Sequence, residues 1–196
     1  MRAHLVIFVK EPRMGRVKTR LARDIGKVAA WRFYRSMLAT LPARLNRKGP
    51  WQTWIAHSPD GWNPTQSGLR AYGYLKQGRG DLGARMLRPA QSLPAGPFIV
   101  IGTDIPDIQL HHIRKAIRLL GQNDAVFGPA DDGGFWLVGL KRHPILSNPY
   151  RKPVRWSHPQ TLADCLVNLK GKKVAFIEIL NDVDDGASFL AWRQNK

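Results

Sequence analysis

The chain has 196 residues, of which 43% are hydrophobic, and its seven Trp and seven Phe suit a globular core rather than a disordered chain. Its single cysteine, Cys165, excludes an internal disulfide and a Cys-rich zinc site. Apolar runs stay short of the roughly 20 residues of a membrane span, and the chain starts directly on an apolar run without a signal peptide. We therefore expect one cytoplasmic domain over residues 1–196 with no membrane span.

Lys and Arg number 31 against 14 Asp and Glu, which gives a net charge of +17. Nucleic acid, an anionic membrane and phosphorylated small molecules all suit such a charge. The basic residues are dispersed between the apolar segments instead of forming one tract, and motifs typical of RNA-binding or zinc-finger modules are missing from the sequence. We expect a small-molecule partner and no specific nucleic acid.

Apolar runs alternate along the chain with segments of helical periodicity. Strands are expected at 5–9, 51–56, 69–75, 98–101, 125–127, 135–140 and 174–179. Helices are expected at 30–45, which Pro42 kinks or ends, at 80–93 with a kink at Pro89, and at 110–120, 161–169 and 187–193. The alternation predicts a largely parallel sheet covered on both faces, with one antiparallel or irregular part around the double glycine Gly133-Gly134.

Asp104 stands where the most apolar strand, residues 98–101, runs out into Gly102-Thr103. A carboxylate at the end of a buried strand is costly unless a donor, water or a cation compensates its charge. In open α/β sheets, ligands bind at this edge. Asp104 is therefore a metal or ribose ligand at a nucleotide site, or alternatively the cap of a helix that starts near Ile108.

A basic loop follows the first strand and precedes the first helix, the position at which backbone N–H groups hold phosphate. It reads Lys10-Glu11-Pro12-Arg13-Met14-Gly15-Arg16-Val17-Lys18-Thr19-Arg20-Leu21. Gly15 permits close backbone approach, while Lys18 and Arg20 supply charge and donors. The loop is neither a Walker A loop nor a dinucleotide fingerprint, and by spacing alone a solvated basic loop is the alternative.

The order of the motifs along the chain is more specific than any single motif. After the basic loop come Gln77-Gly78-Arg79-Gly80-Asp81-Leu82-Gly83-Ala84-Arg85-Met86, Gly102-Thr103-Asp104-Ile105-Pro106, Asp131-Asp132-Gly133-Gly134-Phe135-Trp136, Arg155-Trp156-Ser157 and Asp182-Val183-Asp184-Asp185. This succession resembles a bacterial family described as DUF2064, or transferase-1 proteins associated with radical-SAM enzymes. It is also distantly similar to the nucleotidyltransferases that make molybdenum-cofactor dinucleotides and activated phospholactate.

The resemblance implies a single-domain, three-layer α/β/α GT-A (Rossmann-like) fold of the nucleotide-diphospho-sugar transferase superfamily, with a mostly parallel mixed sheet. It implies that a nucleotide is held through its phosphates, and the residues matched to that task are Lys10, Gly15, Lys18, Arg20, Gly80 and Arg85. Asp104 and Asp184 match the acidic positions that bind Mg²⁺ or Mn²⁺. The late motif departs from the family pattern, so Asp182 and Asp185 compete with Asp184.

We expect a metal-dependent transferase that moves a glycosyl group from a nucleotide-diphospho-sugar to a small acceptor. The alternatives are a nucleotidyltransferase that releases pyrophosphate from an NTP and a non-catalytic nucleotide- or nucleic-acid-binding protein. Lys18 and Asp132 are the candidate catalytic residues. Asp132 would orient the acceptor or take its proton, or alternatively only shape the turn before Gly133.

Overall fold

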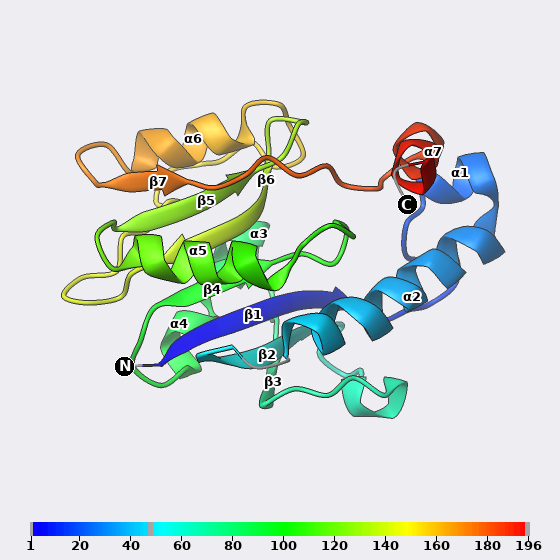
Figure 1. The fold of residues 1–196 in the computed structure, drawn as a ribbon, viewed down its shortest axis with the longest axis horizontal. Coiled ribbons are helices and arrows are strands. Elements are labelled where there is room, and N and C mark those ends of the chain that lie inside the picture. Colours follow the sequence, from blue (N-terminus) through cyan, green and yellow to red (C-terminus); the bar gives the residue numbers. More distant parts are fainter. Residues whose placement is uncertain (1, 47–48, 195–196) are drawn as a thin grey trace.

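A seven-stranded sheet forms the middle of the protein in a computed structural model that describes residues 2–46 and 49–194 (Figure 1). The strands are β1 (Ala3–Lys10), β2 (Trp51–Ser58), β3 (Gly73–Lys76), β4 (Phe98–Ile101), β5 (Ala125–Pro129), β6 (Phe135–Leu140) and β7 (Val174–Phe176). Their order in the sheet is β3-β2-β1-β4-β6-β5-β7. All pair in parallel except β6, which is antiparallel to both β4 and β5. The mostly parallel, mixed α/β sheet is thereby confirmed.

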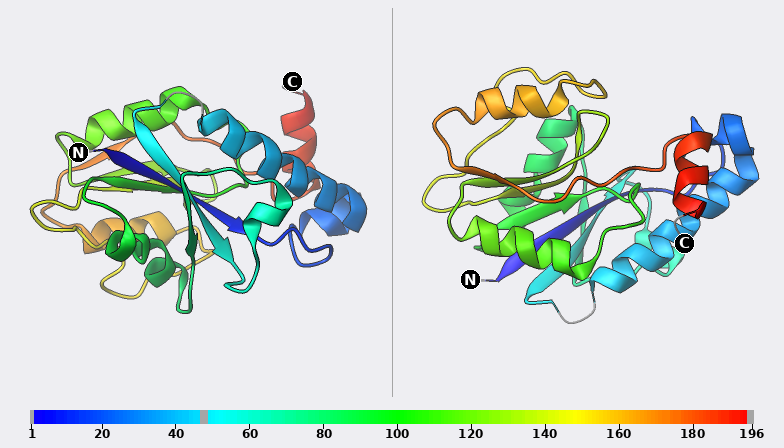
Figure 2. Two further views of the ribbon diagram at one scale, coloured as in Figure 1. Left: turned by 90° about the horizontal axis from the view of Figure 1, so that it is seen from below. Right: turned by 45° about the horizontal axis from the view of Figure 1, so that its top comes forward.

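Helices cover both faces of the sheet and give it three layers (Figures 1 and 2). They are α1 (Leu21–Ile25), α2 (Lys27–Leu45), the 3-10 helix η1 (Pro64–Ser67), α3 (Leu82–Leu87), α4 (Pro89–Ser92), α5 (Leu110–Leu120), α6 (Thr161–Asn168) and α7 (Gly186–Gln194). Side chains of α2 and α5 join the core on one face, and those of α3 and α6 join the core on the other. Helices α1 and α7 lie side by side at one end of the molecule (Figure 1).

The continuous apolar runs of the central strands follow from burial on both faces. In β1, Leu5 and Ile7 pack in the α2 and α5 layer while Val6 packs in the α3 and α6 layer. In β4, Ile99 and Val100 divide between the same two layers. Alternating side chains point to opposite faces, so a strand between two helical layers needs apolar residues at every position.

Several helix boundaries differ from the expectation. Helix α2 continues through Pro42 to Leu45, because a proline in the last turn removes only one backbone hydrogen bond, and Asn46 N–H still donates to Pro42 C=O at 2.9 Å. The expected helix 80–93 is two short helices, since Pro89 occupies the first turn of α4. Helix α5 begins at Leu110 with Gln109 as its N-cap. The hypothesis that Asp104 caps this helix is therefore wrong.

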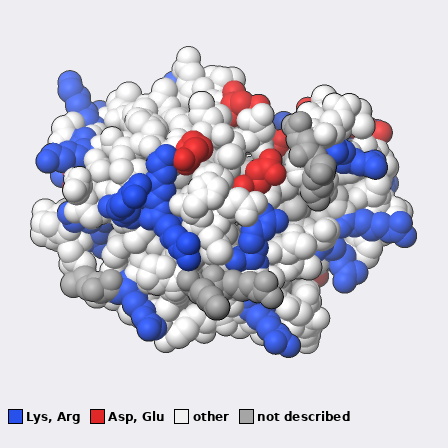
Figure 3. All heavy atoms as spheres, viewed as in Figure 1, with Lys and Arg blue, Asp and Glu red and all other residues white. Residues whose placement is uncertain are grey.

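The surface is charged without one dominant basic tract on the face that Figure 3 shows, where Lys and Arg side chains stand over several elements. Within residues 2–46 and 49–194, no helix is long and apolar enough to cross a membrane.

Arg142 fastens the segment that leads from α4 into β4. Its guanidinium donates to Gly96 C=O at 2.7 Å, to Ala90 C=O at 2.8 Å and to Leu93 C=O at 3.2 Å, and it also donates to Pro94 C=O. These carbonyls belong to α4 and to the turn that follows it, so the arginine holds the connection into β4, the strand that Asp104 follows.

Arg142→Ala is expected to lower the free energy of unfolding by about 2–3 kcal/mol, because several carbonyls lose a charged donor together. Urea denaturation followed by far-UV circular dichroism measures the change. Arg151→Ala, at an exposed arginine, is the matched control and should leave the midpoint within error. An Arg142→Ala midpoint equal to that of the control would contradict the role given to these hydrogen bonds.

Candidate functional site

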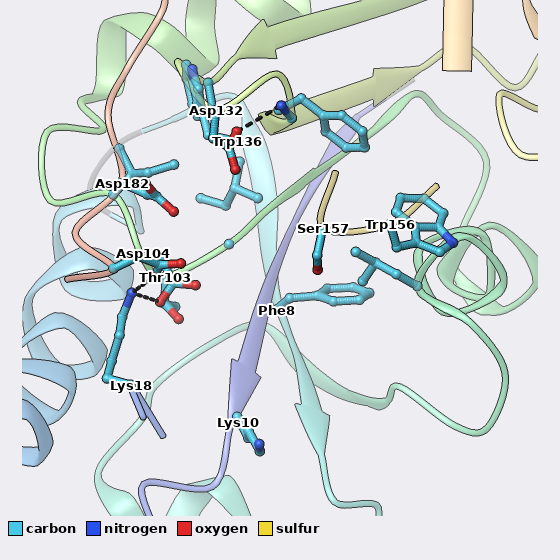
Figure 4. Close-up of a pocket in the computed structure, with 18 of the residues that line it drawn as sticks. Phe8, Lys10, Lys18, Thr103, Asp104, Asp132, Trp136, Trp156, Ser157 and Asp182 are labelled. Carbon is cyan, nitrogen blue, oxygen red and sulfur yellow. Dashed lines mark hydrogen bonds and ion pairs between the residues drawn. The ribbon is translucent and has the colours of Figure 1, made fainter. Parts of the chain in front are cut away.

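A cavity of about 890 Å³ lies at the carboxyl edge of β1 and β4, within the size range of small-molecule sites. Its walls come from the loop before α1, the strand ends, helix α3, the turn before β6, the segment before α6 and the segment before α7 (Figure 4). Among the residues that line it are Phe8, Lys10, Arg16, Lys18, Arg20, Tyr34, Gln77, Arg85, Thr103, Asp104, Asp132, Trp156, Ser157, Asp182 and Asp184.

The Lys18 ammonium joins two carboxylates at one end of this cavity. Its Nζ lies 2.8 Å from Asp104 Oδ1 and 2.7 Å from Asp184 Oδ1, and it donates to Val183 C=O at 2.9 Å. An ammonium has three hydrogens, and here each has an acceptor. The Lys18 side chain is 5% exposed, whereas the side chains of Asp104 and Asp184 are 48% and 34% exposed. The lysine is thus buried beneath carboxylates that face the cavity.

The chain segment after β7 brings Asp184 to Asp104 from 80 positions away in the sequence. Ile177 N–H donates to Phe127 C=O at 2.9 Å, which keeps the segment beside β5. Val183 N–H then donates to Asp104 C=O at 3.0 Å. The next residue, Asp184, therefore arrives beside the Asp104 carboxylate at the edge where β4 ends.

Burial and neighbouring charges raise the pKa values of two residues in this cluster, Lys18 and Asp182. Burial by itself would lower the pKa of Lys18, but the charges of Asp104 and Asp184 outweigh it and raise that pKa above its ordinary value. Burial, and next the charge of Asp184, raise the pKa of Asp182 to about 7. The lysine is held charged, while Asp182 keeps its proton into the neutral range.

Tyr34 and Gln77 bond to the ends of strands β1 and β2 beside the cavity. Tyr34 Oη accepts from Lys10 N–H at 2.8 Å and donates to Lys10 C=O at 2.9 Å, and burial raises the pKa of this phenol to about 12. The buried Gln77 donates through Nε2 to Val9 C=O at 3.1 Å and to Ala56 C=O at 2.8 Å, and its Oε1 accepts from Arg85. The Arg85 guanidinium is thereby anchored at the cavity wall.

The turn before β6 packs tightly against the segment before α6. Gly133 has φ +83°, and a Cβ there would collide with the carbonyl oxygen of Pro159, so only glycine fits. Asp132 Oδ1 accepts from Gly134 N–H at 2.8 Å and shapes this turn while lining the cavity. Ser157 has φ +55° in the facing segment. It and Lys18, with φ +48°, are non-glycine residues in the left-handed region, and both line the cavity.

The other end of the cavity is apolar. Phe8 and Trp156 stand there beside Ser157, facing away from the cluster of Lys18 and Asp104 (Figure 4). The cavity thus has one charged and one aromatic end.

Most of the residues expected in the site meet at this cavity. Those that line it are Lys10, Lys18, Arg20, Arg85, Asp104, Asp132 and Asp184. Gly15 and Gly80 do not line it. Gly15 has φ +75° and open space where a Cβ would stand, and Gly80 has φ +110°, so in this structure both glycines serve the backbone conformation of their loops.

Sequence reasoning assigned no role to several residues of the cavity, notably Tyr34, Gln77 and Ser157. Gln77 and Ser157 fall in motifs that carried the family resemblance, which was the available signal; Tyr34 looked only like a residue of a helix core. Of the competing acidic residues, Asp182 and Asp184 line the cavity. Asp185 instead accepts from Ser188 N–H at 2.8 Å at the start of α7.

With the Lys18 ammonium in place, the arrangement does not fit a metal ion held by protein side chains alone. Within the two described ranges, no group of three or more His, Cys, Asp or Glu side chains is placed to hold a metal. Asp104 and Asp184, the residues expected to bind Mg²⁺ or Mn²⁺, direct their Oδ1 atoms at the Lys18 ammonium instead. Metal binding here stays a prediction.

Comparison with known proteins gives one family and one fold. The profile of the family described as "Uncharacterized protein conserved in bacteria (DUF2064)" matches residues 40–158. No curated protein matches this chain. A protein of Desulfovibrio desulfuricans G20, provisionally described as a nucleotide-diphospho-sugar transferase, is 27% identical, with a TM-score of 0.89 over 100% of this chain and 89% of that one.

Two more distant structures are cytidylyl-transferring enzymes. CMP:2-keto-3-deoxy-manno-octonic acid synthetase, solved with CTP, is 13% identical with a TM-score of 0.64 over 100% of this chain and 98% of that one. The inositol-1-phosphate CTP transferase from T. maritima is 11% identical with a TM-score of 0.61 over 95% and 91%. At these identities the likeness shows the fold alone. Support for a transferase enzyme comes from the match at 27% identity.

Asp182→Asn is expected to stabilise the protein relative to the native chain, and to do so more at pH 8 than at pH 4. The folded-state pKa of Asp182, about 7, lies above the ordinary value of about 3.9 for an unfolded Asp, so its contribution to stability is lost as pH rises between these values. The asparagine has no proton to lose. After discounting for partial exposure, the difference between variant and native should grow on the order of 1–2 kcal/mol from pH 4 to pH 8.

Urea unfolding at both pH values measures this difference. Asp107→Asn, at an exposed carboxylate, is the control and should show much less pH dependence. A difference between Asp182→Asn and the native protein that is the same at pH 4 and pH 8 would show that Asp182 ionises normally.

Proposed function

This chain belongs to the DUF2064 family, and we propose that it is a transferase that takes a nucleotide-diphospho-sugar and moves the glycosyl group to a small acceptor. The observation that carries the proposal is the cavity at the carboxyl edge of β1 and β4, because this edge is where open α/β sheets bind ligands. Four cationic side chains line it besides Lys18: Lys10, Arg16, Arg20 and Arg85. The 27% identical structure described as a transferase of this class supports the same reaction.

The reaction asks the protein to stabilise a departing nucleoside diphosphate. The bond between the anomeric carbon and the β-phosphate oxygen breaks, the oxygen keeps the electron pair, and the acceptor oxygen bonds to the carbon. Cationic donors such as Arg20 and Arg85 near the phosphates stabilise the charge that develops on the leaving group. The acceptor proton passes to a base, and Asp132 is our candidate because its carboxylate lines the cavity at the turn before β6.

Nucleotidyl transfer is the second candidate. There the acceptor attacks the α-phosphorus of an NTP and pyrophosphate leaves. Its support is the similarity of the fold to enzymes that transfer cytidylyl groups, one of them solved with CTP. Both reactions need the same phosphate-binding residues, so only their products separate them.

Arg20→Ala should weaken binding of a nucleoside diphosphate about tenfold, corresponding to about 1.4 kcal/mol for one exposed charge-assisted contact, and leave binding of the parent nucleoside unchanged. Isothermal titration calorimetry with the best-binding base from a small panel measures both affinities. Arg23→Ala is the matched control, because Arg23 is an exposed arginine of α1 outside the cavity lining. Equal weakening of nucleoside and nucleotide would mean that Arg20 acts on the fold and not on phosphate.

Product analysis tests the proposed reaction. With a panel of nucleotide-diphospho-sugars and no acceptor, we expect slow release of free nucleoside diphosphate as water replaces the acceptor, detected by anion-exchange chromatography. Parallel incubations with NTPs are read for pyrophosphate. Pyrophosphate from an NTP, with no nucleoside diphosphate from any sugar donor, would overturn glycosyl transfer and favour nucleotidyl transfer.

A further inference from the structure

Lys18 occupies the place at which a cation bound by Asp104 and Asp184 would sit. We propose that the Lys18 ammonium and a divalent cation are alternative occupants of this carboxylate pair. The protein without phosphate ligands holds the ammonium there and excludes the metal. A bound nucleotide opens the pair by offering its phosphate oxygens to Lys18; this second half of the inference rests on the proposed function.

The first ground is that the Lys18 ammonium and a divalent cation would bind the same oxygen atoms. Lys18 Nζ lies 2.8 Å from Asp104 Oδ1 and 2.7 Å from Asp184 Oδ1. A Mg²⁺ ion needs oxygens at about 2.0–2.1 Å in near-octahedral geometry. It cannot share both Oδ1 atoms with an ammonium already bonded to them without strong repulsion between the two cations.

The second ground is the charge left behind when the ammonium departs. Besides Asp104 and Asp184, Asp182 and Asp132 line the same cavity, and among the described residues Lys18 is the cation within ion-pair distance of Asp104. Arg20 Nη2 is 3.8 Å from Asp184 Oδ2 and its side chain is 68% exposed. Removing the ammonium therefore leaves adjacent carboxylates without a close counter-charge, which is the donor set that hard divalent cations prefer.

The third ground is that Lys18 can change partners. The residue has φ +48°, a backbone conformation that costs energy for any residue with a Cβ, so the backbone at Lys18 is strained in this arrangement. The four-carbon stem is flexible, and Arg16 and Arg20 of the same loop line the cavity. A polyphosphate drawn to those arginines would bring acceptor oxygens within reach of the ammonium.

The test is a Mn²⁺ titration followed by electron paramagnetic resonance, in which binding removes the signal of free Mn²⁺. Four proteins are compared without nucleotide: native, K18M, K18Q and K27M. Lys27, exposed at the start of α2, is the matched control for loss of one positive charge. We expect K18M and K18Q to bind one Mn²⁺ at least tenfold more tightly than native and K27M, and K18M/D104N to lose that gain.

The unfolding midpoint gives an independent readout. Mn²⁺ should raise the midpoint of K18M and K18Q and leave that of native and K27M unchanged, since a cation that binds only the folded state stabilises it by mass action. If neither Lys18 variant folds in metal-free buffer, Mn²⁺ is expected to restore a cooperative transition. Absence of that restoration would count against the proposal.

Two results overturn the inference directly. The native protein binding Mn²⁺ as tightly as K18M would show that the ammonium excludes nothing, and no Mn²⁺ binding by folded K18M or K18Q would show that the carboxylates are not a cation site. No donor, acceptor or nucleotide enters this titration. Its failure leaves the proposed transfer reaction standing, and failure of the product analysis leaves the competition at Lys18 standing.

Discussion

The charge of Asp104 and Asp184 has to be compensated where the sheet ends. The Lys18 ammonium does this with one hydrogen directed to each carboxylate, while its third hydrogen bonds to Val183 C=O. A single buried cation thereby ties together three segments: the loop before α1, the end of β4 and the segment that precedes α7. Removing one partner from such a cluster leaves the others charged and poorly solvated. The shape of the charged end of the cavity therefore depends on these contacts more than on any one helix.

Sheet order explains why these segments can meet at all. Strands β1 and β4 are parallel neighbours, so the loop that carries Lys18 and the turn that carries Asp104 leave the sheet at the same edge. The segment after β7 returns along that edge through hydrogen bonds to Phe127 C=O and Pro129 C=O before it reaches Asp104. The antiparallel β6 brings the turn of Asp132 there as well, because β6 starts at the edge where β4 ends.

Local signals in the sequence predicted the parts of this arrangement that arise from local physics. Burial on both faces makes β4 a continuous apolar run, so the strand and the position of Asp104 at its end could be predicted. The bounds of α5 could be predicted as well, because this helix is strongly amphipathic. The break between α3 and α4 was missed because Pro89 reads as a kink as readily as a helix start. The convergence of Asp104 and Asp184 on Lys18 could not be predicted from spacing, since it depends on the long return of the chain after β7. The family resemblance named all three residues but not their mutual pairing.

Folding and ligand binding make compatible demands on this cluster. In the absence of ligand, the ammonium satisfies carboxylates that the fold has gathered at one edge, which avoids the free-energy cost of unpaired charge in a half-buried place. An incoming polyanion can exchange those acceptors for phosphate oxygens without a net loss of hydrogen bonds, because an ammonium bonded to a carboxylate and one bonded to a phosphate form similar charge-assisted contacts. Left-handed backbone at Lys18 and Ser157, on opposite sides of the cavity, fits the same view, since strain of this kind persists where neighbouring structure holds it and where a change of partner can relieve it. The interaction that stabilises the site before a ligand arrives is thus also the one best placed to respond when the ligand binds.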